Sequence, residues 1–487
     1  MKNLFNNPKS IIAILAILFF VISFFSAGGN VIDLTDIKDY TDTAKFFAGE
    51  YAAKHRSAHS DLYGLILSPY VKLANSFFLI KLSSAFFLLM LILSIYFISG
   101  KNKKTLLLAA TIPIFWYFTP WISPIPVASL LILWAYYFAR RFNVEDKIKY
   151  LIYSGILVGL AGAFWDTALY LSLFFLIAFF YDKKLVSGGI FIISLITGLA
   201  PRLILDQLVY NLASYSILKH AFAVFAFTIY GGIYQGNFNS NYLVAIMLFA
   251  LFVPFYSFLL IKKRIITNSK KEAIFIILTL LFIIPNPQPR VLLIIMPLII
   301  LQLGKIIDNK QLRVQLIISE IISLLVITPY AIQFKYEIKG GERLDSAIVN
   351  IKNLEIIPQS YKLLQSDLNK ISNDYPNRIF LVGNKNDDYR QLAHLYWGDK
   401  IKELVSIEDY NLFKENETIV ASKKISSNSG TDKRRELWIE IGLSKSRNDS
   451  TDYKSIEYAI GIGEPISLKE FKLIKRYDSL YLSEKIE

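Results

Sequence analysis

Long apolar runs, separated by short segments with charged residues, proline or glycine, occupy the first two thirds of the chain. Many of these runs approach the roughly 20 residues that an α-helix needs to cross a bilayer, although several are shorter. The pattern therefore predicts about eleven transmembrane helices. They cover residues 10–27, 77–99, 105–120, 122–139, 150–165, 167–181, 185–200, 241–261, 272–285, 290–304 and 314–333.

The overall composition belongs to the same class of protein. The chain is 54% hydrophobic and 19% charged, with a mean hydropathy of +0.42. These values are typical of a polytopic α-helical membrane protein, not of a soluble globular protein. Because the first apolar run is followed by further predicted spans, we expect it to be a retained signal-anchor and not a cleaved signal peptide. The chain has no cysteine, which excludes disulfides, thiolate catalysis and cysteine metal sites.

Clusters of lysine and arginine occur at every second loop between the predicted spans. Because cytoplasmic loops of membrane proteins are enriched in these residues, the alternation places the N-terminus and all five clusters in the cytoplasm. The same loops account for the formal net charge of +14, so we expect contact with lipid head groups and no nucleic-acid partner. The clusters are Lys101–Lys104, Arg140–Lys149, Lys183–Lys184, Lys262–Lys271 and Lys305–Arg313.

The remaining loops are then predicted on the extracytoplasmic side. They comprise an acidic loop at 28–76, a bend at 119–126, a turn at 165–166, a segment at 201–241, a turn at 286–290 and the C-terminal region. The 201–240 segment is partly apolar but charged, which suits an interfacial helix or a re-entrant segment. The expected location is the cell membrane of a prokaryote, or the ER membrane if the source is eukaryotic.

The composition changes near Lys335 to that of a soluble domain. We therefore predict a membrane domain over residues 1–335 and an extracytoplasmic α/β domain over 336–487. In the second domain the pattern predicts a helix over 358–374, a strand over 378–383 and a helix between Asp387 and Gly398. Further strands are expected at 402–407, 417–421, 436–443 and 471–475.

The acidic first loop is the richest in candidate chemistry. Asp33–Tyr70 contains aspartates, a glutamate and two histidines, and a charge at mid-bilayer costs about 2.5–3.5 kcal/mol. Asp36 and Asp39 lie three residues apart, so on a helix they share one face. Two neighbouring carboxylates raise one pKa, which suits a general base near neutral pH. The alternative is that these aspartates only solvate the polar face of an interfacial helix.

Several short patches resemble a known superfamily. Asp36 followed by Tyr40, then Gly49-Glu50-Tyr51 and Leu62–Tyr70 (LYGLILSPY), resembles the first outer loop of the GT-C glycosyltransferases. The likeness points to the polyprenyl-phosphate-mannose-dependent mannosyltransferases and the protein O-mannosyltransferase-like branch. In those families an acidic residue before a tyrosine in this loop is the proposed catalytic base. The resemblance thus implies Asp36 as the base, with Asp39 as the other match.

A second patch lies at the start of a late span. PQPRVLLIIMP, from Pro287 to Pro297, is similar to a segment in which an arginine meets the lipid-linked phosphate. The resemblance implies this role for Arg290, with Val291 at the position of the usual tyrosine. Tyr210-Asn211 resembles a Tyr-Asn pair in the mid-chain outer loop of the family.

Other polar residues on the outer side are candidates for substrate binding. Arginine pairs with phosphate oxygens in a planar fork, and both Arg290 and Arg202 lie at the end of a predicted span. Snorkelling at the interface is the alternative for each arginine. Aromatic side chains can stack on a sugar, although anchoring at the interface is their usual role. The further candidates are Tyr40, Asp166, His55, Arg56, Lys219 and His220.

A metal-independent mechanism is favoured, with no cofactor. Metal-dependent relatives carry acids in both the first and the second outer loop, whereas the bend at 119–126 has none. A hard divalent cation requires several carboxylate oxygens, and only Asp166 is placed to lend one. His55 and His59 are spaced four apart, but no third ligand follows in a fixed pattern, which disfavours zinc.

The expected activity follows from the outer location, where soluble nucleotide donors are absent. The resemblance implies transfer of mannose or another hexose from a polyprenyl- or dolichyl-phosphate carrier to a hydroxyl of a protein, glycan or lipid acceptor. In-line attack at the anomeric carbon then inverts its configuration. The alternatives are a transporter or flippase of lipid-linked sugars, a lipid-linked oligosaccharide ligase or polymerase, and a membrane-anchored interaction protein. The transporter alternative is disfavoured because the titratable groups cluster in outer loops and no internal repeat is evident.

Overall fold

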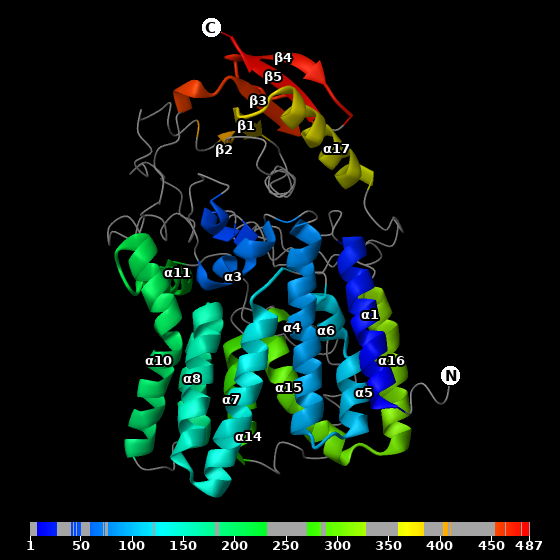
Figure 1. Cartoon of the computed structure of the whole chain (residues 1–487), viewed down its shortest axis with the longest axis vertical. Helices are drawn as coiled ribbons and strands as arrows, with labels where there is room; N and C mark the ends of the chain where they lie inside the picture. Colours follow the sequence, from blue (N-terminus) through cyan, green and yellow to red (C-terminus); the bar gives the residue numbers. More distant parts are fainter. Residues whose placement is uncertain are drawn as a thin grey trace.

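A bundle of long helices and a small mixed sheet make up the computed structural model of the chain (Figure 1). The structure describes residues 7–26, 40–41, 43–44, 46–49, 59–71, 73, 76–119, 122–180, 185–230, 270–283, 289–327, 359–383, 403–407, 410, 453–462, 464–478 and 480–486. The bundle helices are α1 (Pro8–Ser26), α3 (Leu62–Val71), α4 (Ser76–Ile98), α5 (Lys103–Thr111), α6 (Pro113–Phe118), α7 (Ile125–Glu145), α8 (Ile148–Phe164), α9 (Asp166–Phe175), α10 (Leu185–Tyr210), α11 (Tyr215–Tyr230), α14 (Lys270–Ile283), α15 (Pro289–Ile306) and α16 (Asn309–Ile327).

Every apolar run that lies within the described residues is helical, as predicted, and three of the differences in boundaries bear on the packing or on the site. The run at 105–120 is divided into α5 and α6 at Pro113, because proline cannot donate the backbone hydrogen bond that would continue the helix. The run at 167–181 ends in one π-helical turn, Leu176–Phe180. Helix α10 continues to Tyr210, ten residues beyond the predicted end, and carries polar residues in this extension.

Two of the described helices are long and apolar enough to cross a bilayer, judged by length and composition alone. They contain Leu79–Ile98 and Val186–Tyr210, and several other apolar helices are shorter. The predicted total of about eleven spans stays a prediction, and the run at 241–261 lies outside the described residues.

Helices α8 and α10 approach each other backbone to backbone. A Cβ atom added at Gly159 would lie 2.0 Å from the carbonyl oxygen of Leu195, and one added at Gly198 would lie 2.0 Å from that of Ile156. Only glycine fits at such positions, because any side chain would displace the opposite backbone. The contact therefore fixes the position of the C-terminal part of α10 relative to the residues that follow α8.

One end of the bundle holds the basic connections. The Lys104 ammonium donates to the carbonyl oxygen of Ile307 at 2.9 Å, and the Lys271 ammonium donates to Asn143 Oδ1 at 3.0 Å. In the connection between α7 and α8, an ion pair with Glu145 raises the pKa of Lys147. Basic loops that are distant in sequence thus lie in contact at the same end of the bundle, as the alternation of charged loops predicts.

The C-terminal part contains helix α17 (Gln359–Asp374) and a five-stranded sheet. The strands are β1 (Ile379–Gly383), β2 (Glu403–Ser406), β3 (Tyr458–Ile462), β4 (Phe471–Arg476) and β5 (Leu480–Lys485), in the order β2-β1-β3-β5-β4. Strand β1 pairs in parallel with β2 and β3, whereas β5 is antiparallel to β3 and β4. The sheet lies beyond the end of the bundle at which α3 and α11 lie (Figure 1).

The sequence pattern predicted α17, β1, β2 and β4, but it missed β3 and β5. The glycines of the GIG at 461–463 hid β3, because glycine is uncommon in strands. The packing around Gly461 explains why glycine is present there. A Cβ atom there would lie 2.0 Å from the carbonyl oxygen of Glu464, so the strand passes close to the turn that follows it. The predicted helix between Asp387 and Gly398 and the predicted strands at 417–421 and 436–443 lie outside the described residues.

Candidate active site

Four segments meet at the end of the bundle opposite the basic connections: residues 59–61 before α3, the junction of α8 and α9, the end of α10, and α11. Trp165 has an extended backbone that separates α8 from α9, so Asp166 opens a new helix. A carboxylate is favoured at this position, because the N-terminus of a helix carries partial positive charge.

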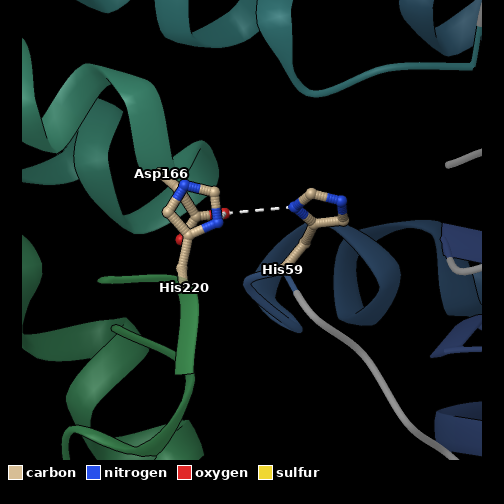
Figure 2. Close-up of side chains that lie close together, drawn as sticks. All are labelled: His59, Asp166 and His220. Carbon is tan, nitrogen blue, oxygen red and sulfur yellow. Dashed lines mark hydrogen bonds and ion pairs between the residues drawn. The ribbon is translucent and has the colours of Figure 1, made fainter. Parts of the chain in front are cut away.

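Asp166 lies at the centre of this group of residues (Figure 2). Its Oδ1 atom accepts a short hydrogen bond from Arg202 Nη2. Its Oδ2 atom lies 3.3 Å from His59 Nδ1 and 3.8 Å from His220 Nδ1. The Asp166 side chain is 4% exposed, whereas each imidazole is 21% exposed. The carboxylate is therefore enclosed, while both histidines keep a surface that a ligand can reach.

Arg202 is completely buried and its guanidinium is held from three directions. Nε donates to Ser216 Oγ at 2.8 Å, Nη1 donates to the carbonyl oxygen of Gly162 at 3.0 Å, and Nη2 donates to Asp166. A buried charge is tolerated only when its hydrogen bonds and its counter-charge are both supplied, and here they are. The geometry favours Arg202 as the group that orients Asp166.

Asp206 extends this network along α10. Ser216 accepts from Arg202, and its hydroxyl and backbone N–H both donate to Asp206 Oδ2, at 2.7 and 2.9 Å. The other oxygen of Asp206 is buried and has no hydrogen-bond partner in the part of the chain that the structure describes. Two carboxylates, Asp166 and Asp206, thus hold the start of α11 against α10 through Arg202 and Ser216.

Residues 59–61, before α3, are attached to the network by a third buried carboxylate, Asp61. Tyr210 donates to Asp61 Oδ2 at 2.9 Å, and its ring stacks on Tyr215 with centroids 4.0 Å apart. The ammonium of Lys219 lies 5.5 Å from the centroid of the Tyr215 ring, a cation–π distance. Ser60 also donates to the carbonyl oxygen of Ala163, which ties the loop to the end of α8.

Tyr40 is buried against residues 59–63. Its ring centroid lies 5.9 Å from that of His59 and 5.2 Å from that of Tyr63. The Tyr63 hydroxyl lies 2.8 Å from Ser84 Oγ on α4, so this aromatic group bridges the loop and the second apolar helix. Tyr40 thus borders the partly exposed His59 from within the core.

The structure brings together several residues that the sequence named separately. Asp166, Arg202 and His220 form one cluster, with Lys219 and Tyr40 beside it. Arg290 lies in the first turn of α15, and the placement of its side chain is outside what the structure describes. The remaining predicted site residues also lie outside the described residues: Asp36, Asp39, His55 and Arg56.

Asp61 and Asp206 are site residues that the sequence analysis missed. A signal for one of them was present, because Arg202, Asp206 and Tyr210 recur every fourth residue. On a helix this spacing places all three side chains on one face. The predicted end of the span at residue 200 hid this polar face, since it left these positions in a loop.

Two solved structures share this fold. The crystal structure of ArnT from Cupriavidus metallidurans bound to undecaprenyl phosphate matches with a TM-score of 0.56 and 10% identity, over 96% of this chain and 98% of that one. The structure of the same protein in the apo state gives a TM-score of 0.54 and 9% identity, over 96% and 97%. The chain has the GT-C fold. Neither protein-family models nor curated proteins match the sequence.

This likeness supports the predicted GT-C fold, because the match covers 96% of this chain and 98% of the other. At about 10% identity it carries no information on sugar or acceptor. The mannosyltransferase branch therefore stays a prediction.

Proposed function

We propose that the chain is a membrane glycosyltransferase that moves a sugar from a polyprenyl- or dolichyl-phosphate carrier to an acceptor hydroxyl on the extracytoplasmic face. The observation that carries the proposal is the cluster of Asp166, Arg202, His59 and His220. It lies against the first outer loop, in a fold that another protein uses to bind undecaprenyl phosphate. Mannose or another hexose is the expected sugar.

The donor phosphate binds beside the cluster in this proposal. Transfer from a lipid phosphate requires cationic or hydrogen-bonding groups that stabilise the departing phosphate. His59 and His220 are partly exposed and both approach Asp166 Oδ2, and Lys219 precedes His220 on α11. Arg290 supplies a further cation from the first turn of α15. Arg202 acts indirectly, because its guanidinium is buried and bonded to protein acceptors.

The catalytic base is Asp36, with Asp39 as the alternative. The carboxylates of the described cluster are poor candidates for this role. Asp166 is paired with Arg202, and Asp61 is 1% exposed and accepts a hydrogen bond from Tyr210. A base must reach the acceptor hydroxyl within about 2.6–3.2 Å, which an enclosed and paired carboxylate does not do. The base takes the proton of the acceptor hydroxyl, whose oxygen attacks the anomeric carbon as the phosphate leaves.

The test uses the purified full-length protein in lipid nanodiscs with radiolabelled polyprenyl-phosphate mannose and a membrane extract as acceptor. Wild type is expected to transfer label, and Asp36→Asn to lose at least about 100-fold in rate while still binding the donor. Asp33→Asn, in the same loop, is the matched control and should retain activity. Equal transfer by wild type and Asp36→Asn would remove Asp36 as the base, and Asp39→Asn then identifies the alternative.

A panel of donors extends the same assay. If no polyprenyl-phosphate sugar gives transfer, the proposal of a transferase is contradicted. Movement of intact labelled lipid across the bilayer, with no change of the glycosidic bond, would instead support a flippase.

A further inference from the structure

We propose that His59, Asp166 and His220 form a zinc-binding site. One ligand atom from each residue lies within 4.8 Å of the other two. Two of the separations are 3.3 and 3.8 Å, both measured from Asp166 Oδ2 to the Nδ1 atoms of the histidines. Ligands at about 2.0–2.1 Å from a tetrahedral zinc ion are separated by about 3.4 Å, so only small side-chain movements are needed.

The donor set suits zinc. Two imidazole nitrogens and one carboxylate oxygen, with a fourth position for a water or substrate, are the ligands of catalytic zinc sites. Harder cations such as Mg²⁺ and Ca²⁺ prefer sites made of oxygen atoms. Since each imidazole is 21% exposed while Asp166 is 4% exposed, the fourth position would face the accessible side of the histidines.

Arg202 supports the site from behind. It occupies Asp166 Oδ1, so Oδ2 is the oxygen that faces both histidines. Ligating carboxylates are commonly hydrogen-bonded by a second layer of residues that fixes their orientation. The guanidinium, held by Ser216 and Gly162, is such a partner.

The three ligands come from three segments that are far apart in the sequence. His59 precedes α3, Asp166 opens α9 and His220 is on α11, so no short motif connects them. In the sequence, the lack of acids in the bend at 119–126 disfavoured a divalent cation, and the pair His55 and His59 had no third ligand for zinc. The fold supplies that third ligand, and a fourth residue to orient it.

The balance of charge indicates what would complete the coordination. With neutral histidines, the Asp166 and Arg202 charges cancel and a bound zinc ion leaves two positive charges in a partly enclosed site. An anion such as phosphate is then a favourable fourth ligand, and by linkage phosphate should in turn strengthen zinc binding. This last step rests on the proposed function, because it identifies the anion with the donor phosphate.

Zinc binding is measured on the full-length protein in nanodiscs after removal of metal with a chelator. Zinc chloride is titrated against a fluorescent zinc indicator, and bound metal is counted by mass spectrometry. We expect one zinc ion per chain. His59→Ala and His220→Ala should each weaken binding by at least about 100-fold, because loss of second-layer partners alone costs 10–100-fold. His394→Ala, at a histidine that is not one of the three proposed ligands, is the matched control and should bind as wild type does.

Size-exclusion profiles and thermal unfolding identify variants that misfold, and His59→Gln and His220→Gln replace any that do. Absence of stoichiometric zinc in wild type, or equal zinc binding by wild type and all folded histidine variants, would overturn the site. Because no sugar donor is present in this assay, its failure is distinguishable from failure of the proposed function. Donor binding without zinc contradicts only the metal site, whereas zinc binding without any donor binding or transfer contradicts only the transferase.

Discussion

The two ends of the helix bundle use the same charged residue types in opposite ways. At the basic end, the ion pairs of Glu145 with Arg141 and Lys147 lie at the surface, where the cationic side chains are 47% and 58% exposed. At the other end, Arg202 is 0% and Asp166 is 4% exposed. Exposed pairs add little to stability, whereas a buried charge that loses its partner is strongly destabilising. The basic end is thus suited to setting orientation in the membrane, and the enclosed end to building a precise site.

Removal of the buried arginine tests this contrast with the largest expected effect. Arg202→Met leaves Asp166 buried without its main counter-charge, which should cost about 3–5 kcal/mol of folding stability. Thermal unfolding in detergent measures the loss. Arg141→Met at the basic end is the matched control and should leave the melting temperature almost unchanged. Equal melting temperatures for the two variants would contradict the contrast.

A double variant sharpens the same test. Replacement of both partners, as in Asp166→Leu with Arg202→Met, removes the uncompensated charge and should recover part of the stability that Arg202→Met loses. No recovery would mean that the loss arises from the other contacts of Arg202, with Ser216 and Gly162.

Loss of the hydrogen bond between α10 and residues 59–61 should give an intermediate effect. Tyr210→Phe removes only the hydroxyl group. It therefore takes away the hydrogen bond that Tyr210 donates to Asp61 Oδ2 at 2.9 Å. Hydrogen bonds to charged groups contribute about 1.5–3 kcal/mol, so the melting temperature should fall. We also expect faster proteolysis of the 59–61 loop in Tyr210→Phe than in wild type. An unchanged melting temperature and cleavage rate would show that this hydrogen bond does not hold the loop.

The close approach of α8 and α10 predicts a further loss of stability. Gly198→Ala places a methyl group against the carbonyl oxygen of Ile156 and should cost about 1–3 kcal/mol by overpacking. Gly189→Ala, on the same helix, meets no atom within 4 Å and should be neutral or stabilising, because alanine is the better helix former. Both melting temperatures are measured in the same detergent. A destabilised Gly189→Ala with an unaffected Gly198→Ala would contradict the packing of these helices.

Much of the helical layout could be predicted from sequence, because a bilayer requires long apolar segments with recognisable ends. The basic clusters also predicted which connections lie together, and Lys104 and Lys271 do contact distant connections. Breaks and extensions were harder to place. A run through Ile112-Pro113 looks continuous in hydropathy, and the polar end of α10 looks like a loop.

The candidate site could be predicted only as separate residues. Asp166 and Arg202 are 36 residues apart, His59 and Asp166 are 107 apart, and Asp61 and Tyr210 are 149 apart. Such pairings depend on how the helices pack, which local patterns do not specify. The every-fourth-residue spacing on α10 is the exception, and it could have identified Asp206. The roles of Asp36, Asp39 and Arg290 stay predictions.

Measuring the orientation of the chain in the membrane tests the proposed function most directly. Transfer from a lipid-phosphate sugar on the extracytoplasmic face requires the end of the bundle that holds Asp166 and Arg202 to face outward. The chain has no cysteine, so single cysteines can be introduced without a background. Ala213→Cys lies at the exposed junction of α10 and α11, and Lys147→Cys lies in the exposed connection between α7 and α8. A membrane-impermeant maleimide added to intact cells should label Ala213→Cys and leave Lys147→Cys unlabelled until the cells are opened. Labelling of Lys147→Cys alone in intact cells would contradict the account.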